Sequence, residues 1–277
     1  MTDGTISPEL PELESFQTFF ERWLSEQNQH LHHLILASQH NHSNNKNNNN
    51  AEDEDDPVLL GVLVERVVKH YETYYEVKSR WAEQDVLAML SPPWTSSLED
   101  AFFWIGGWRP SMAFHLLYAK SGLQLEAQLT ELMQGLSTGD LADLSQRQLA
   151  QVDQLQMRTI EQEKHITHKM AKLQDTIADT QMVELSHVVT EMMRNNGHEE
   201  VDHHQDLVES TLASKEKDLE VMLHRADELR LRTIKKMTHI LTPIQATHFL
   251  IAAAELHLRL HDWGKKKDVS GQRADHL

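Results

Sequence analysis

The sequence contains 19 histidines, so ligation of a metal ion or a haem by imidazole nitrogen is the first chemistry to consider. His257 and His261 lie four residues apart in a segment with helical periodicity. This spacing would place both rings on one helix face, about 6 Å apart along the axis. Such a pair can bind a divalent metal ion weakly or can stay unliganded at the surface. We take His257 and His261 as the main ligand candidates.

Three other pairs of histidines are weaker candidates. One lies in an asparagine-rich tract, one is flanked by lysines on a charged helix face, and one consists of adjacent residues in an expected connection. None of these settings holds two imidazole rings toward a common point. The three pairs are His40 with His42, His165 with His168, and His203 with His204.

Groups that would support catalysis are missing from the sequence pattern. The chain has no cysteine, which excludes disulfides, thiolate ligands and cysteine nucleophiles. Its serines fall in expected caps and loops without a partnered base, and the Gly106-Gly107 pair predicts a backbone corner rather than a phosphate-binding loop. The sequence therefore predicts that the protein is not an enzyme.

The charge balance argues against nucleic acid as a direct partner. There are 26 Lys and Arg against 43 Asp and Glu, a formal net charge of -17, which repels phosphate backbones. The nearest basic cluster, Lys265 to Lys267, is short. No signal peptide pattern and no apolar run of about 20 residues is present, so we expect no membrane contact and a location in nucleus and cytoplasm.

The segment from Ser96 to Pro110 is expected to be the structural hub. Ser96 with Glu99 forms a capping box that predicts a helix running through Ile105, and the paired glycines should end it. Arg109 is expected to stack on a tryptophan and to bond to carbonyls or an acid, so that Arg109→Ala destabilises the fold by more than about 1 kcal/mol. The hub residues are Trp104, Gly106, Gly107, Trp108, Arg109 and Pro110.

Helical periodicity accounts for the rest of the chain, and no strand pattern competes with it. We expect an all-α bundle of seven to nine helices, several of them long and antiparallel, with residues 12–264 as one domain between tails at 1–11 and 265–277. Residues 38–56 are expected to be a disordered loop because the tract is polar and then acidic. Other ends are expected near Ser91, Gly122, Gly135, residues 194–205 and Gly264.

Three ordered motifs make the chain similar to a plant family. They are LEDAFFWIGGWRPS, DLSQRQLAQVDQLQ and RADELRLRTIKKMTHILTPIQATHFLIAAAELHLRLHDWG. The chain resembles the domain shared by the delay-of-germination proteins and the C-terminal half of TGA-type basic leucine-zipper transcription factors, over about residues 13–264. TGA factors carry their basic region and zipper upstream, whereas only about a dozen residues precede the domain here.

The resemblance implies regulation rather than catalysis. Zipper-free members are associated with seed dormancy, abscisic-acid responses and, in one branch, pollen aperture formation. They are thought to bind partners, notably type 2C protein phosphatases, with the N-terminal helix in the contact. The matching residues here are Phe16, Phe19, Phe20, Trp23 and Leu24. An aromatic stripe of this kind is also typical of a helix face that packs into a core.

Dormancy members of the family are described as haem-binding through a histidine pair, and the matching segment here is LHLRLHDW with His257 and His261. Two imidazoles on one side of a helix cannot easily occupy opposite faces of one porphyrin. One histidine would therefore be an axial ligand with the other in support, or a second ligand would come from elsewhere. An unliganded pair is the alternative.

Other functions stay open on the sequence alone. The chain could act as a transcriptional co-regulator that pairs with TGA-type factors, and it could self-associate. A calmodulin target or a lipid-binding bundle is a more generic alternative, because a groove between helices accepts an amphipathic helix or an acyl chain.

Overall fold

The computed structural model describes residues 15–47, 55–127, 140–194 and 201–274, and every regular element within these ranges is helical. This confirms the expected all-α bundle. In chain order the elements are α1 (Phe16–Asn47), α2 (Asp55–Ala82), α3 (Val86–Leu90), α4 (Ser97–Phe102), α5 (Met112–Ala127), η1 (Leu141–Asp143), α7 (Gln146–Asp175), η2 (Thr176–Ala178), α8 (Thr180–Arg194), α9 (Val201–Ile240) and α10 (Pro243–Ala274).

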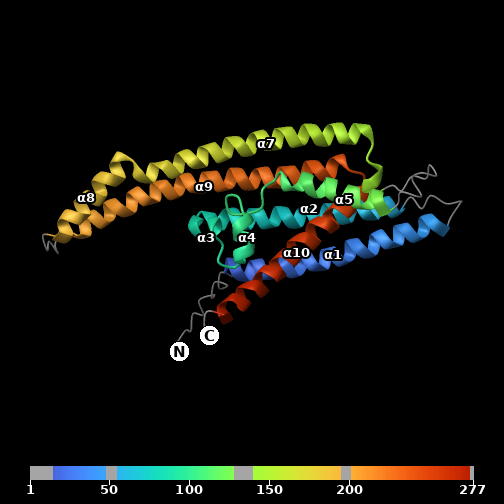
Figure 1. Cartoon of the computed structure of the whole chain (residues 1–277), viewed down its shortest axis with the longest axis horizontal. Helices are drawn as coiled ribbons and strands as arrows, with labels where there is room; N and C mark the ends of the chain where they lie inside the picture. The colour runs from blue at the N-terminus through green and yellow to red at the C-terminus, as the bar shows by residue number, and fades with distance from the viewer. Residues whose placement is uncertain (1–14, 48–54, 128–139, 195–200, 275–277) are drawn as a thin grey trace, which may run out of the picture.

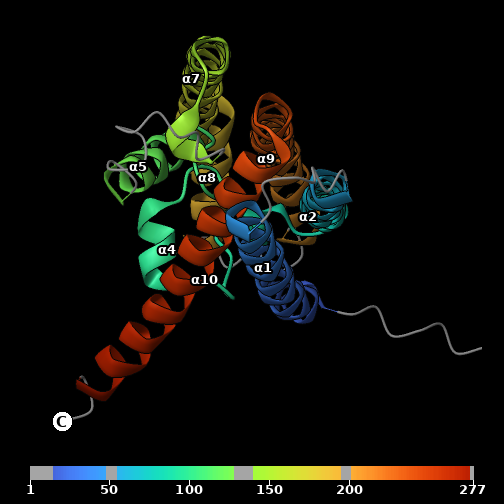
Figure 2. The ribbon, with the colours of Figure 1, turned by 90° about the vertical axis from the view of Figure 1, so that its right-hand side faces the viewer.

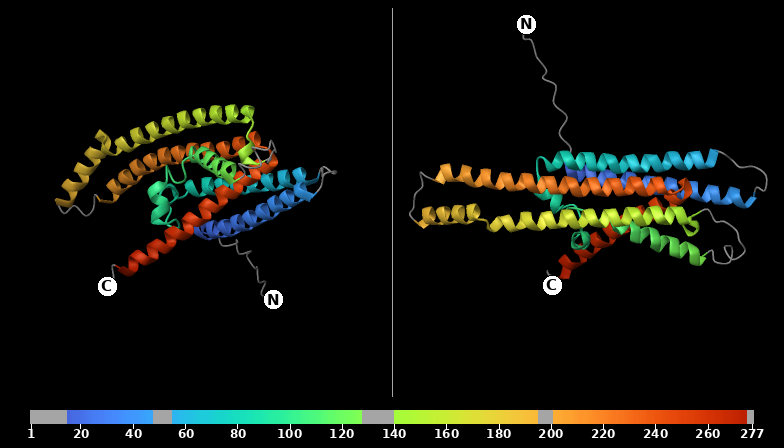
Figure 3. Two further views of the ribbon diagram at one scale, coloured as in Figure 1. Left: turned by 45° about the vertical axis from the view of Figure 1, so that its right-hand side comes forward. Right: turned by 90° about the horizontal axis from the view of Figure 1, so that it is seen from above.

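The longest helix, α9, is the axis around which the others are arranged. Helix α7 runs antiparallel along one side of α9 and α2 lies along another, as Figure 1 shows. Helix α1 packs on α2 and α10, and α10 crosses the bundle obliquely, a crossing that is clearest from the end in Figure 2. At the N-terminal end of α9, α8 packs back on α9 (Figure 3).

Three predicted helix starts are confirmed by reciprocal capping boxes. Ser96 with Glu99 begins α4, and Ser145 with Gln148 begins α7. At α10 the Thr242 amide donates to Gln245 Oε1 at 3.0 Å, while the Gln245 amide donates to Thr242 Oγ1 at 3.4 Å. Each box satisfies amide groups that the first helical turn leaves unpaired.

Glycines predicted to end helices do not end them. Helix α5 continues through Gly122, and α10 continues ten residues past Gly264. At Gly264 an added Cβ would lie 2.0 Å from Ser96 Oγ, so the missing side chain lets α10 cross close to α4. The expected tail therefore begins as helix. Gly135 lies outside the described residues.

Other predicted boundaries were also wrong. Helix α1 runs to Asn47 and α2 begins at Asp55, so residues 38–47 of the expected loop are helical, and residues 48–54 lie outside the described part. Helix α2 ends at Ala82, before the separate α3. The Asp85 carboxylate accepts from the Ala88 amide at 2.9 Å and caps α3. The connection expected up to residue 205 is helical from Val201.

Buried side chains form two main clusters. The larger one joins α1, α2, α5, α7, α9 and α10 and includes Phe114, Leu117 and Met237. The second joins the start of α1 to α2, α3 and Trp94, with Phe16 and Trp94 ring centroids 4.7 Å apart. Their burial fixes the positions of α1, α2, α9 and α10 around the cavity described next.

Candidate functional site

A loop between α4 and α5 turns its backbone carbonyls inward. Ile105 and Gly106 both have positive φ, 48° and 66°, and the Trp104 amide donates to the Gly107 carbonyl at 2.7 Å. A Cβ on Gly106 would lie 2.4 Å from the Met89 carbonyl oxygen, so only glycine fits there. The predicted corner at Gly106-Gly107 is therefore present, but the helix before it ends at Phe102.

Arg230 of α9 is the cation that holds this loop. Its Nε donates to the Trp108 carbonyl at 2.7 Å and its Nη2 donates to the carbonyls of Ile105, at 2.9 Å, and of Trp104. Its Nη1 pairs with Asp227, and its guanidinium lies 5.4 Å from the centre of the Trp104 ring. A guanidinium carries five N–H donors in one plane and is therefore suited to bind several acceptors that converge on it.

Lys78 of α2 adds a second buried cation to the same cluster. Its Nζ donates to the Gly106 carbonyl at 2.8 Å and lies 3.1 Å from Asp227 Oδ2. Burial lowers the pKa of Lys78 to about 8, an effect that Asp227 opposes and Arg230 reinforces. Two cations, one carboxylate and four carbonyls therefore saturate one another; we call Lys78, Asp227 and Arg230 the ion cluster.

Arg109, the arginine singled out from the sequence, makes weaker versions of the contacts expected of it. Its guanidinium lies 5.3 Å from the Trp104 ring centre and 3.6 Å from Glu163 Oε2, but its side chain is 44% exposed. Arg230, at 4%, is the buried one. Sequence reasoning missed Arg230 because nothing local links it to a loop more than 120 residues earlier.

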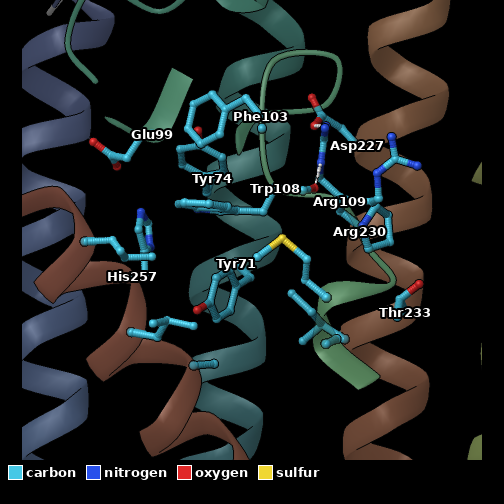
Figure 4. A pocket seen from close by; sticks show the side chains of 18 of the residues that line it. Tyr71, Tyr74, Glu99, Phe103, Trp108, Arg109, Asp227, Arg230, Thr233 and His257 are labelled. Carbon is cyan, nitrogen blue, oxygen red and sulfur yellow. Dashed lines mark hydrogen bonds and ion pairs between the residues drawn. The ribbon is translucent and has the colours of Figure 1, made fainter. Parts of the chain in front are cut away.

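A cavity of about 580 Å³ lies between α1, α2, α9, α10 and the loop. In Figure 4, Asp227, Arg230 and Thr233 line one side, His257 lies on the opposite side, and Tyr71 and Tyr74 lie between them. Trp108 of the loop projects into the space. Its size and largely apolar walls are typical of a small-molecule site with a few polar groups.

His257 borders this cavity as a neutral imidazole. Burial lowers the pKa of His257 to about 4, against the opposing charge of Glu99. Its ring centroid lies 5.7 Å from that of Trp23 and 6.3 Å from that of Trp108. A neutral ring nitrogen beside a cavity is the form that ligates metal centres.

His261 is engaged elsewhere. Its Nδ1 lies 3.0 Å from Oε2 of Glu99, a fully buried carboxylate that also accepts from the Ser96 hydroxyl and amide. Burial opposes ionisation of Glu99, but these hydrogen bonds outweigh it and lower its pKa. Glu99 Oε1 is buried without a hydrogen-bond partner. The two candidate histidines therefore do different things.

The positions of His257 and His261 show which of the expected modes of haem binding the site could accommodate. A clamp by both histidines does not fit, because His261 is held by Glu99 and only His257 lines the cavity. A haem held by His257 as the ligand from α10 would be compatible with the apolar cavity and the neutral ring. His115 of α5 also lines the cavity and is the second histidine there. No group of three metal-ligating side chains occurs within the described ranges.

The residues expected to contact a partner lie in the second core cluster. Phe16, Phe19, Phe20 and Trp23 are buried and Leu24 is half-buried, so they position α1 in this conformation. The exposed face of α1 instead carries polar side chains such as Thr18, Glu21 and Ser25. Binding by this segment stays a prediction.

The helical bundle, its apolar cavity and its ion cluster define an all-α domain with an internal cavity. Residues 30–119 match the DOG1 family, described as "Seed dormancy control". Protein DOG1-like 3 of Arabidopsis thaliana is 32% identical over 213 residues, which are 74% of this chain and 72% of that protein. The chain belongs to the DOG1 family, which confirms the resemblance.

Two further relatives show how far the similarity extends. Protein DOG1-like 4 of Arabidopsis thaliana is 30% identical over 257 residues, 92% of this chain and 94% of that protein. The TGACG-sequence-specific DNA-binding protein TGA-2.1 of Nicotiana tabacum is 28% identical over 89% of this chain but only 45% of its own length. These matches support a regulatory role, and neither name denotes an enzyme.

Among the described residues, none of the helices is both long and apolar enough to span a membrane.

Proposed function

We propose that the chain is a non-enzymatic regulator of seed dormancy and abscisic-acid signalling that acts by binding other proteins, with a type 2C protein phosphatase as the main partner, in nucleus and cytoplasm. Membership of the seed dormancy family carries this proposal. The structure contributes the surface: the aromatic side of α1 is buried, so its exposed polar face, around Glu21 and Ser25, would be the contact.

A binding measurement with a matched control tests the phosphatase partner. The double substitution Glu21→Arg with Ser25→Arg changes the exposed face of α1 without touching the buried aromatics. Gln154→Arg with Glu161→Arg makes the same charge change on the exposed face of α7. We expect the α1 variant to bind a purified type 2C phosphatase at least about tenfold more weakly by calorimetry, a loss of 1.4 kcal/mol.

The two possible failures mean different things. No binding by the unmodified chain would remove the phosphatase from the proposal. Equal binding by the two double variants would instead move the contact away from α1.

We further propose that the cavity accepts haem with His257 as a protein ligand. Bound haem would supply redox or gas-sensing chemistry, while this chain's residues would bind and orient it: His257 at the iron and the aromatic walls against the ring. His261, held by Glu99, would position α10 rather than ligate. The family resemblance and the neutral imidazole beside an apolar cavity support this.

A hemin titration followed by absorption spectroscopy separates the two histidines. We expect His257→Gln to abolish the shift of the Soret band and His261→Gln to retain it. His165→Gln, on the exposed face of α7, serves as the control. A full Soret shift in the His257→Gln protein would exclude this ligand.

A second candidate function is co-regulation of transcription through a TGA-type factor. The specific observation is that the similarity to TGA-2.1 covers nine-tenths of this chain. Mixing the purified chain with a full-length TGA factor and its DNA site, then measuring a supershift, tests it. A shift of DNA by this chain alone would contradict the charge argument above.

A further inference from the structure

We propose that the exposed face of the C-terminal half of α10 binds an acidic segment of a partner protein. The proposal rests on the role of the chain as a binding protein but names a surface separate from α1; of this surface, only Leu256 also borders the cavity. This surface, the α10 stripe, consists of Leu256, Arg259, Trp263, Lys266, Lys267 and Ser270.

The spacing of these residues places them on one side of the helix. Steps of three, four and seven residues recur along the stripe, and each of its side chains is exposed. Trp263 is 56% exposed, whereas Trp23, Trp94 and Trp104 are buried. An exposed tryptophan between cations is unlike the other tryptophans of the chain and typical of a contact anchor.

The side of α10 opposite the stripe is bonded to the segment that begins α4. Lys265 Nζ donates to the Thr95 carbonyl at 3.0 Å, and the Ser97 amide donates to Asp268 Oδ2 at 3.0 Å. Gly264 lies directly against Ser96. These contacts hold the stripe facing outward on a helix that projects beyond its neighbours in Figure 2.

The two lysines of the stripe are unpaired, in contrast to several lysines elsewhere in the described part of the chain. Neither Lys266 nor Lys267 has a carboxylate within 4.0 Å in the described part of the chain, whereas Lys215 and Lys217 pair with Asp179 and Glu220. They lie about two turns before the helix end, too early for the helix macrodipole to explain them, since its effect falls off within the last turn.

Acidic side chains touch only one edge of the stripe. Arg259 Nη1 is 3.2 Å from Asp262 Oδ2, both exposed, and Glu255 borders the same edge one turn earlier. The positive part is therefore the stretch around Trp263, Lys266 and Lys267. In a chain of net charge -17, this patch is complementary to a negatively charged partner.

The surroundings favour a protein segment over a phospholipid or nucleic acid surface. Trp263 and Leu256 offer too little apolar area for a helix to lie in a bilayer interface, which needs a whole apolar face. The strongly acidic remainder of the chain is repelled by any extended anionic surface. A short acidic peptide avoids that repulsion, and an apolar residue within it would cover the Trp263 ring.

Fluorescence anisotropy with a defined probe tests the proposal on the full chain. The probe is a fluorescein-labelled 14-residue peptide of Asp and Glu with a central Leu-Phe pair, and the same peptide with Gln and Asn is its neutral counterpart. We expect saturable binding of the acidic probe that weakens at least about fivefold in Lys266→Gln with Lys267→Gln, and similarly in Trp263→Ala.

The matched control is Lys164→Gln with Lys172→Gln, two exposed lysines of α7, which should leave the affinity within twofold. Equal weakening in this control, or no saturable binding of the acidic probe, would overturn the proposal. So would tighter binding to vesicles of phosphatidylserine and phosphatidylcholine than to the probe. So, too, would sedimentation showing that the stripe variants lose only a dimer of this chain.

Phosphatase binding measured on the same preparations separates the two ideas. Retained phosphatase affinity with no probe binding would remove the stripe proposal alone. Loss of phosphatase binding in the α1 double variant, with probe binding intact, would locate the two contacts on different surfaces.

Discussion

The two ends of the central cavity both carry buried charge, but only one of them is saturated. At the loop end, Arg230 and Lys78 meet Asp227 and four backbone carbonyls, so each of their side-chain nitrogens has an acceptor. At the α10 end, Glu99 keeps one oxygen without a hydrogen bond and His257 is neutral beside open space. Saturated charge holds a fold, whereas incompletely paired groups beside a cavity are free to meet a ligand.

The loop end should therefore respond most strongly to mutation. We expect Arg230→Met to destabilise the protein by about 3–5 kcal/mol, because it leaves the loop carbonyls without donors and alters the buried charge around Asp227. Chemical denaturation monitored by circular dichroism measures this loss.

Arg109→Met is the matched control for the same ring. Arg109 also lies over Trp104, but its partial exposure limits its effect to about 1 kcal/mol or less, smaller than the sequence suggests. Similar losses in the two variants would contradict the division between a buried and a peripheral arginine.

A substitution at the crossing of α10 and α4 should have the second-largest effect on stability. An alanine at Gly264 would bring its Cβ to 2.0 Å from Ser96 Oγ and force α10 away from the capping box, so we expect Gly264→Ala to cost about 1–3 kcal/mol. Gly122→Ala, in a helix position with nothing within 4 Å, should instead stabilise by about 0.5–1 kcal/mol. Thermal melts should show a lower Tm for Gly264→Ala and a higher Tm for Gly122→Ala than for the unmodified chain.

The pH dependence of stability should be the most specific contrast. Burial lowers the pKa of His257 to about 4, below its unfolded value of about 6.5. The unfolded chain therefore binds a proton in this window that the folded chain does not, so stability falls as pH falls from about 6.5 to 4.

His257→Gln should reduce this slope in urea titrations taken across the window without removing it, because burial also lowers the pKa of His70 to about 4, and His165→Gln should leave the slope unchanged. Glu99→Gln should act below that range, because the lowered pKa of Glu99 contributes stability that is lost as the pH drops through its folded value. An unchanged slope in His257→Gln would show that its ring is protonated in the folded protein.

Local signals in the sequence predicted the helix starts well and the helix ends poorly. The capping boxes at Ser96, Ser145 and Thr242 depend on residues three apart and were confirmed. Glycine has two uses that look alike in sequence: it ends a helix, or it admits a neighbouring backbone. Gly264 serves the second, and only the position of Ser96, far away along the chain, reveals it.

The candidate site was predictable to the same degree. The tryptophan- and glycine-rich segment identified the loop, and the spacing of His257 and His261 identified one wall of the cavity. The different roles of those histidines depend on Glu99, which of the two bonds only to His261. The buried cation that holds the loop is Arg230. Both contacts are long-range pairings that no local periodicity encodes.

The long separation in sequence between the loop and Arg230 has a consequence for biosynthesis. Arg230 follows Trp108 by 122 residues and Asp227 follows Lys78 by 149, so the left-handed turn at Ile105 and Gly106 has Lys78 nearby but lacks Arg230 until α9 has emerged from the ribosome. Until then Lys78 also lacks its carboxylate partner, Asp227. Closure of the centre is therefore a late event, and a nascent chain truncated before α9 should remain open to chaperones and proteases.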